Sequence, residues 1–131
     1  MGGFDATSNV LAGKLLGVPI SGTHAHSFVM SHTSLHSAEG LWVTSLKGGG
    51  DVKLQPLVLK YRRDHGWGES NDGELAAFTD YACAFPDVCL CLIDTRATLC
   101  SGLRNFIFVA LALDDLGHTP RGIGIPLILI K

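Results

Sequence analysis

The chain has 131 residues, enough for one domain or part of one, and its 47% hydrophobic and 17% charged residues are typical of a folded globular protein. Its formal net charge of −2 excludes the strongly basic surface of a nucleic-acid-binding protein, so we expect no nucleic-acid partner. No apolar run is long enough to span a bilayer, and residues 1–16 lack the basic start and apolar core of a secretory signal. We therefore expect no membrane contact.

The amino-terminal part of the chain predicts a helix, a strand and a polar loop. Apolar residues recur at helical spacing over residues 5–16, and Gly17 can end that helix. Residues 18–20 are expected to form a short strand, and residues 21–27 a loop of small polar residues. A second helix is expected to begin near Phe28.

The stretch from residue 31 to residue 72 has a different composition. It is rich in Gly, Ser and His and contains three consecutive glycines at 48–50. Its apolar alternation over residues 54–63 is interrupted by Pro56. We therefore predict a long irregular insertion, or mobile loop, over residues 31–72.

Regular structure is expected to return with a helix over residues 74–85. Asn71 and Asp72 are suitable caps, because short polar side chains accept hydrogen bonds from the first helical N–H groups. Pro86 ends the helix, since proline cannot continue it. The apolar side chains that share one face of this helix are Leu75, Phe78, Ala82 and Phe85.

A continuous apolar run follows at residues 88–93, as expected for a strand covered on both faces. A second helix is predicted over residues 104–116, and a further strand over residues 121–125. The alternation of strands and helices is typical of a parallel βα layout. We therefore predict an α/β fold with helices on one side of a short parallel sheet that contains residues 88–93. The pattern alone does not distinguish an open sheet from the arc of a barrel.

Two polar motifs directly follow predicted strands. Residues 22–27 follow the first strand, and Asp94 and Thr95 follow the run at 88–93. Because parallel strands present their carboxyl ends at the same edge, we expect the two motifs to lie at the same end of the sheet.

The four cysteines lack the spacing of a common zinc site. They are separated by five, one and eight residues, and three lie within or beside apolar runs. Buried thiols in a reducing compartment account for this pattern, so we expect a cytoplasmic protein. The cysteines are Cys83, Cys89, Cys91 and Cys100.

Several motifs, taken in order, resemble the nicotinate phosphoribosyltransferase family. They are Gly-Gly-Phe-Asp-Ala-Thr-Ser-Asn-Val-Leu-Ala-Gly at 2–13, Ser-Gly-Thr-His-Ala-His-Ser-Phe-Val at 21–29, Leu-Ile-Asp-Thr at 92–95, Ser-Gly-Leu at 101–103, Asn-Phe at 105–106, and residues 109–117. The resemblance is continuous over residues 2–29 and good over residues 74–123, with little over residues 30–73. It implies an arc of a phosphoribosyltransferase-type α/β barrel, with residues 1–131 as a partial catalytic-barrel domain and residues 31–72 as a flexible insertion.

The resemblance also implies an enzyme of NAD biosynthesis. The family joins nicotinate to phosphoribosyl pyrophosphate, giving nicotinate mononucleotide and pyrophosphate, and couples ATP hydrolysis to this reaction through a phosphohistidine. The implied requirements are ATP and Mg²⁺, with no tightly bound organic cofactor. The full-length family is expected to act as a homodimer.

The family's phosphohistidine falls on His26, and the threonine that lines its nicotinate pocket falls on Thr23. A neutral imidazole is nucleophilic near neutral pH, so His26 can accept a phosphoryl group from ATP. Ser27 and Asn9 can donate hydrogen bonds to phosphate oxygens, and Asp94 can hold ribose hydroxyls or a magnesium ion. The residue types alone leave an alternative: Thr23 and Asn9 as turn or cap residues, and Asp94 as the cap of the next segment.

Four histidines close in sequence leave a metal-binding module as a further alternative. His32 and His36 are spaced so that a helix would bring them to one metal ion. The intervening Thr33 and Ser34 are weak helix formers, so a solvated polar loop is the plainer interpretation and we predict no metal site. The four residues are His24, His26, His32 and His36.

The resemblance ends near Gly124. There the family has an arginine that holds the nicotinate carboxylate, within Arg-x-Asp-Ser-Gly-Asp, whereas residues 124–131 form a divergent apolar end. Arg96 replaces the tyrosine of the family's Asp-Thr-Tyr, and the family's amino-terminal domain has no counterpart here. We therefore expect the chain alone to be inactive. The alternative to a plain enzyme is a truncated, non-catalytic form that associates with full-length subunits.

Overall fold

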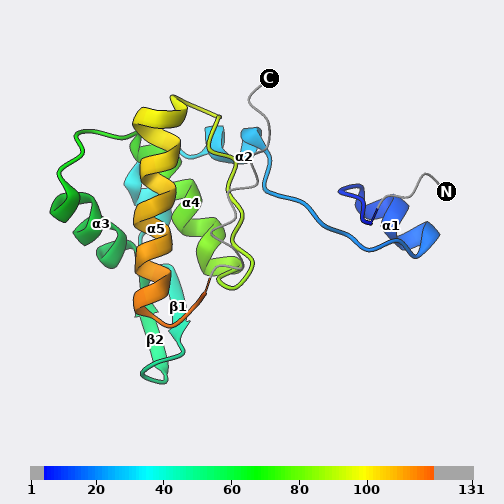
Figure 1. Cartoon of the computed structure of the whole chain (residues 1–131), viewed down its shortest axis with the longest axis horizontal. Helices are drawn as coiled ribbons and strands as arrows, with labels where there is room; N and C mark the ends of the chain where they lie inside the picture. Colours follow the sequence, from blue (N-terminus) through cyan, green and yellow to red (C-terminus); the bar gives the residue numbers. More distant parts are fainter. Residues whose placement is uncertain (1–4, 120–131) are drawn as a thin grey trace.

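The structure is a computed structural model that describes residues 5–119. Figure 1 shows α3, α4 and α5 gathered in one body, with the two strands at one end of it and α1 set apart on an extended segment. Within residues 5–119, no helix is long and apolar enough to cross a membrane. The elements are α1 (Val10–Leu16), α2 (His26–Ser31), the 3₁₀ helix η1 (Leu35–Ala38), β1 (Trp42–Ser45), β2 (Gly50–Lys53), α3 (Leu54–His65), α4 (Asp72–Ala84), the π-helical turn η2 (Thr98–Gly102) and α5 (Leu103–Asp115).

The core lies where α3, α4 and α5 contact one another. α4 is the central helix, since all of its residues from Gly73 to Thr79 are buried. Each fully buried Leu or Phe side chain contributes about 1.5–3 kcal/mol to folding, so this contact is the main source of stability. The largest buried apolar side chains of these three helices are Phe78 and Leu75 of α4, Phe108, Leu113 and Val109 of α5, and Leu54 and Val58 of α3.

The two helices predicted in the second half of the chain are confirmed. α4 begins two residues before the predicted 74–85, and its cap is Asn71, whose side-chain oxygen accepts from the Glu74 N–H at 2.9 Å. α5 begins and ends one residue before the predicted 104–116, and Gly117 follows it with a φ of 88°. Glycine adopts this left-handed conformation without strain, which explains why the helix ends there.

The first helix is shorter than predicted. α1 begins at Val10, not at residue 5, because the Asn9 side chain accepts from the Ala12 N–H at 3.0 Å and so caps the helix there. Gly17 ends α1 with a φ of 63°, as predicted. The α1 surface is strongly apolar, and four of its side chains are 64–73% exposed: Val10, Leu11, Leu15 and Leu16.

The strand predicted over residues 18–20 is reduced to a single parallel bridge between Thr7 and Ile20. The helix predicted near Phe28 is confirmed, but it begins at His26. His26 is therefore the first residue of a helix and not part of the polar loop.

The strand predicted at residues 88–93 is wrong for the described structure. The run lies against the core without a ladder partner, with Cys89 buried and Cys91 and Ile93 half-buried. A strand requires a hydrogen-bonded neighbour, and residues 5–119 provide none for this run. The predicted parallel sheet is thus absent from the described residues, whose fold is mixed helix and strand with a two-stranded antiparallel sheet.

The predicted irregular structure over residues 31–72 is also wrong, because η1, β1, β2 and α3 all lie there. The glycines at 48–50 belong to a hairpin, in which Gly49 has a φ of 65°. Pro56 lies in the first turn of α3, where a missing N–H breaks no helical hydrogen bond. The flexibility of this segment stays a prediction. Its buried contributions to the core are Ala38, Val43, Leu54 and Val58.

The β1–β2 hairpin is tied to the end of α5. Its strands pair with Ser45 opposite Gly50, and the next residue, Leu46, donates its N–H to the Leu116 carbonyl at 2.8 Å. The hairpin therefore extends the helical core at the end away from the start of α5. The strand predicted over residues 121–125 and the divergent end at 124–131 lie outside the described residues.

Candidate functional site

His26, Asp94 and Thr95 lie together although 69 positions separate the first from the last. The His26 ring is about half exposed, with its Nδ1 2.8 Å from Thr95 Oγ1 and its Nε2 3.8 Å from Asp94 Oδ1. The two motifs were expected at the same end of a parallel sheet. His26 does lie beside the Asp94–Thr95 turn, but residues 5–119 contain no parallel sheet, so other contacts bring the two motifs together.

One of the two tautomers of His26 leaves a ring nitrogen available for chemistry, since the Thr95 hydroxyl can accept from Nδ1–H or donate to a bare Nδ1. When Nδ1–H donates to the Thr95 hydroxyl, Nε2 carries the lone pair. The 3.8 Å between Nε2 and the Asp94 carboxylate is too long for a hydrogen bond, so Asp94 acts on Nε2 through its charge. An accessible ring nitrogen whose partner nitrogen is held by a hydroxyl is the arrangement that nucleophilic histidine chemistry needs.

Thr23 and Ser27 flank His26 in the same segment. Thr23 is half-buried, and its hydroxyl donates to the His24 carbonyl at 2.9 Å, so in this structure it stabilises the loop. Ser27 is exposed in the first turn of α2, beside His26. Their contacts with nicotinate and phosphate stay predictions.

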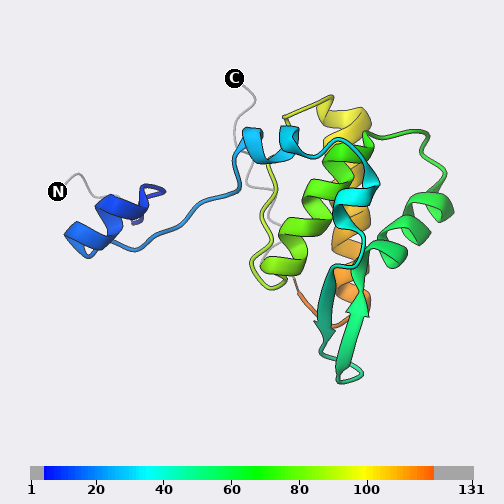
Figure 2. The same ribbon diagram turned by 180° about the vertical axis from the view of Figure 1, so that it is seen from behind.

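Asn9 is not brought to this site. Its side-chain oxygen caps α1, and α1 lies apart from the body that contains α2 in both views (Figures 1 and 2). Backbone bonds hold α1 in a small unit of its own: Thr7 N–H donates to Pro19 at 2.9 Å, and Ser21 N–H donates to Thr7 at 3.1 Å. The contact of Asn9 with phosphate stays a prediction.

His24 is a site residue that sequence reasoning missed. It is only 8% exposed, and its Nε2 accepts the Leu92 N–H at 3.2 Å. Burial lowers the pKa of His24; the hydrogen bond to the Ala25 carbonyl opposes this shift, and the nearby His26 adds to it. Its sequence signal was a second histidine two residues before His26, which we interpreted as part of a solvated loop. The rings around it are Phe28, Phe78 and Tyr81.

Glu74 forms a second polar cluster that we did not predict. Its carboxylate is 1% exposed, and Oε2 accepts from the Ser101 hydroxyl and from Asn105 Nδ2, the latter at 3.1 Å. Asn105 Nδ2 also donates to the Asn71 carbonyl at 3.1 Å. Burial raises the pKa of Glu74, while the Ser101 and Asn105 hydrogen bonds and the Arg96 charge oppose that shift. The cluster therefore joins the start of α4 to the start of α5, next to the Asp94–Thr95 turn.

The sequence did carry a signal for Glu74. It lies four and eight residues before Phe78 and Ala82, so all three share one face of α4. A carboxylate on the apolar face of a helix indicates a buried, hydrogen-bonded group, because burying a bare charge is costly.

Two glycines allow the backbone around the site to approach closely. A Cβ atom on Gly102 would collide with the carbonyl of Ile93, directly before Asp94. A Cβ atom on Gly73 would collide with the carbonyl of His32, at the end of α2. The starts of α5 and α4 thus fix the Asp94 turn and the helix that His26 begins.

The histidine cluster of the sequence does not gather around a metal site. His32 Nε2 lies 3.2 Å from Asp80, and His36 Nδ1 lies 3.0 Å from Glu39. Among residues 5–119, no group of three or more His, Cys, Asp or Glu side chains could hold a metal ion. The four cysteines are free thiols, of which Cys100 is exposed.

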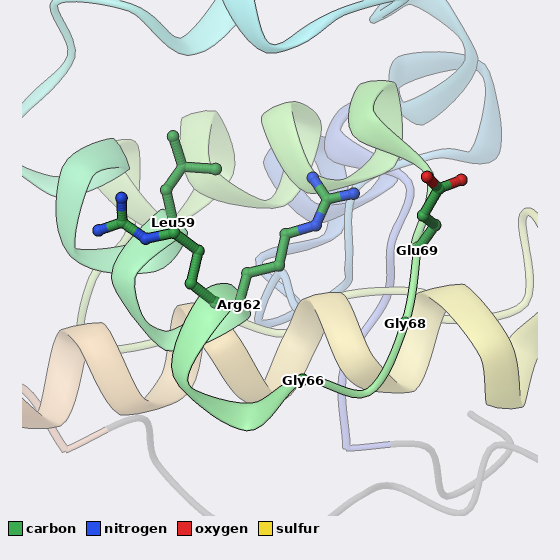
Figure 3. A pocket seen from close by; sticks show the side chains of 6 residues that line it. Leu59, Arg62, Gly66, Gly68 and Glu69 are labelled. Carbon is green, nitrogen blue, oxygen red and sulfur yellow. The ribbon is translucent and has the colours of Figure 1, made fainter.

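A separate cavity of about 510 Å³ opens at the carboxyl end of α3 (Figure 3). The Arg62 guanidinium there is already engaged, at 2.6 Å from Asp72 and 2.9 Å from the Ser70 carbonyl. None of the predicted site residues lines this cavity, and we assign it no part in the His26 site. Its lining residues are Leu59, Arg62, Arg63, Gly66, Gly68 and Glu69.

The individual proteins that match the chain are all of one kind. No model of a protein family matches the chain. Nicotinate phosphoribosyltransferase 1 of Arabidopsis thaliana is 44% identical over 132 residues, which cover 94% of this chain and 24% of that protein. Nicotinate phosphoribosyltransferase of Dictyostelium discoideum is 46% identical over 125 residues, covering 94% and 21%. The crystal structure of human nicotinic acid phosphoribosyltransferase matches with a TM-score of 0.73 and 43% identity, covering 89% of this chain and 25% of that one.

These matches bear on two expectations, the extent of the resemblance along the chain and the family to which the chain belongs. An alignment that covers 94% of the chain must include most of residues 30–73, so the match extends into the segment where we expected little resemblance. The chain spans about a quarter of the length of the Arabidopsis relative. Sequence and structure agree on one group of proteins, and the chain belongs to the nicotinate phosphoribosyltransferase family.

Proposed function

We propose that the chain is the part of a nicotinate phosphoribosyltransferase that accepts a phosphoryl group from ATP, with His26 as the acceptor. The observation that supports this most directly is the His26 ring, held at Nδ1 by Thr95 and open at Nε2. The substrates we propose for the longer enzyme are nicotinate and phosphoribosyl pyrophosphate, and the product is nicotinate mononucleotide for NAD biosynthesis. Thr23 is proposed to line the nicotinate pocket, and Ser27 and Asn9 to bind phosphate.

In the proposed step, Nε2 of His26 attacks the γ-phosphorus of ATP. The N–P bond forms, the bond between the γ-phosphorus and the bridging oxygen breaks, and ADP leaves. The proton on Nδ1 stays on the ring, where donation to Thr95 stabilises the developing positive charge. Water later hydrolyses the N–P bond, which releases phosphate and restores the free histidine for the next cycle.

Asp94 is suited to a magnesium ion at this site. It presents an exposed carboxylate beside Nε2, and Mg²⁺ binds through one or two protein carboxylates together with water and substrate phosphates. When bound, Mg²⁺ neutralises the phosphate charge that develops during transfer. The residues present thus fit an ion that arrives with ATP, and we propose no tightly bound organic cofactor.

We also propose that residues 88–93 become a barrel strand when neighbouring strands are present. The run is apolar and lies between α4 and α5 in the chain, as a strand of an α/β barrel does. Its described backbone donors are bonded only locally or by a side chain, Val88 N–H to Phe85 at 3.3 Å and Leu92 N–H to His24. Residues 1–131 would then be part of the catalytic barrel.

A second proposal is that the chain acts as a non-catalytic partner of full-length subunits, which we propose form a homodimer. The exposed apolar side chains of α1 favour this, because a surface of this kind is normally covered by another part of the protein or by a partner. The free thiols are consistent with the cytoplasmic location that we propose.

The test compares the chain with a chimera in which it replaces the matching quarter of the Arabidopsis enzyme up to residue 123. We expect the chain alone to form no nicotinate mononucleotide, because Gly124 cannot replace the family's carboxylate-binding arginine, a loss of about 2–5 kcal/mol. We expect the chimera to form the product, and His26→Ala to uncouple its synthesis from ATP hydrolysis. Turnover by the 131-residue chain that His26→Ala abolishes would contradict the first expectation. Unchanged ATP use in the His26→Ala chimera would reject His26 as the acceptor.

A further inference from the structure

The two halves of the His26 site are joined without any strand pairing. His24 lies two residues before His26, and Leu92 lies two residues before Asp94. The Leu92 N–H donates to His24 Nε2 at 3.2 Å across 68 positions of sequence. A ring nitrogen here takes the place of the carbonyl that would accept this N–H in a sheet.

This contact determines the tautomer of His24. A backbone N–H can only donate, so Nε2 must be the unprotonated nitrogen. The Ala25 carbonyl can only accept, and it lies 3.4 Å from Nδ1, so Nδ1 carries the proton. The ring is therefore neutral, and burial favours that state by lowering the pKa of His24.

The surroundings of His24 hold the ring in place. Its centroid lies 5.7 Å from that of Phe28, 5.6 Å from Phe78 and 5.0 Å from Tyr81. Phe78 and Tyr81 belong to α4, so the ring is anchored to the buried central helix. The nitrogen that meets Leu92 is thus fixed relative to the core and not only to its own loop.

We propose that His24 is a positioning residue: its unprotonated Nε2 holds Leu92, and so sets the Asp94–Thr95 turn at its distance from His26. The importance of this distance for catalysis rests on the proposed phosphoryl transfer. The contact between His24 and Leu92 does not depend on that proposal. Thr95 and Asp94 then meet His26 because the chain leading to them is fixed two residues earlier.

Two variants of His24 separate its role as a hydrogen-bond acceptor from the packing of its ring. His24→Phe keeps an aromatic ring in the cluster and removes the acceptor. His24→Gln removes the ring and keeps a side-chain oxygen that can accept from Leu92. A role in packing alone predicts that Phe preserves the site and Gln disturbs it, whereas positioning through Nε2 predicts the reverse.

The first measurement is NMR on the complete 131-residue chain. We expect His24 Nε2 to be unprotonated in the wild type. In His24→Phe we expect the Leu92 amide to exchange about 10-fold faster and the contact between His26 and Thr95 to be lost, while His24→Gln retains both. An unchanged Leu92 amide and His26–Thr95 contact in His24→Phe would overturn the proposal. A protonated Nε2 in the wild type would overturn it even if a variant failed to fold.

The second measurement is phosphorylation of His26 in the chimera supplied with ATP. We expect His24→Phe to lower the rate about 10-fold and His24→Gln to restore most of it. If the wild-type chimera gains no phosphoryl group while the NMR results hold, the proposed function fails and the positioning role stands. If His24→Phe is phosphorylated at the wild-type rate, the positioning role fails and the proposed function stands.

Discussion

Two polar clusters in this chain differ in what surrounds them. In the Glu74–Ser101–Asn105 cluster every side chain is at most 5% exposed, and the hydrogen bonds join α4 to α5. In the His26–Asp94–Thr95 cluster the His26 and Asp94 side chains are 49% and 64% exposed. The buried cluster therefore holds the framework, while the exposed cluster keeps a ring nitrogen free to react. Substitutions in the two clusters should separate stability from chemistry.

The largest effect is expected where the framework meets the turn that contains Asp94. Gly102→Ala places a methyl group against the Ile93 carbonyl, and the shift needed to relieve this contact should cost about 3 kcal/mol of unfolding free energy. Gly50→Ala is the control, because Gly50 has open space around its Cα and should change stability by less than about 1 kcal/mol. Urea denaturation of the chain measures both. Equal losses would show that the close approach at Gly102 has no special role.

The second effect compares one residue from each cluster. Asn105→Leu removes the donor to Glu74 and to the Asn71 carbonyl, and should cost about 2–3 kcal/mol because both acceptors are left short of partners. Thr95→Val removes only a contact with the exposed His26 ring and should cost less than about 1 kcal/mol. Thermal denaturation followed by circular dichroism gives the order, and a larger loss for Thr95→Val would reverse the comparison.

The third effect is a pH dependence that belongs to the buried cluster. The folded-state pKa of Glu74 lies above its ordinary value of 4.5 because the group is buried. The folded chain therefore keeps a proton that the unfolded chain releases, so the unfolding free energy falls as pH rises from 4.5 through the folded-state pKa. The contribution is fully present below pH 4.5. Glu74→Gln should remove this slope from a series of denaturation curves. A slope identical to that of the wild type would show that Glu74 is not its source.

The smallest effect on stability is expected for His26→Ala. The ring is half exposed, and surface substitutions of this kind change the unfolding free energy by about 0.5 kcal/mol or less. The same denaturation experiment applies. A loss above about 2 kcal/mol would place His26 in the framework and weaken its assignment as a residue reserved for chemistry.

The parts of the fold that were predictable from the sequence depend on local signals. α4 and α5 follow from helical spacing together with the Asn71 cap and Gly117. The segment at 31–72 was misjudged because Gly and Pro were taken as signs of irregular structure, whereas they occupy a hairpin and the first turn of α3. The strand at 88–93 could not be judged locally, since a strand depends on neighbours that residues 5–119 do not supply.

The site was predictable only where the family resemblance named a residue. The resemblance named His26, and Asp94 lies beside it although the predicted strand before Asp94 is not formed in residues 5–119. His24 and Glu74 depend on partners 68 and 27 positions away. Helical spacing indicates that Glu74 is buried, but it does not identify those partners. Asn9 shows that residue type alone does not decide a role, because an amide suited to phosphate binding is equally suited to capping a helix.

The most direct test of the central claim is to locate the phosphoryl group. The purified chimera is incubated with ATP labelled at the γ-phosphate, and its peptides are mapped under alkaline conditions that preserve phosphohistidine. We expect one labelled site, at His26, which is absent in His26→Ala. The label should be retained in His36→Ala, the control, because His36 is another exposed histidine nearby in the sequence. Label on another residue, or label that persists in His26→Ala, would contradict the assignment of His26 as the phosphoryl acceptor.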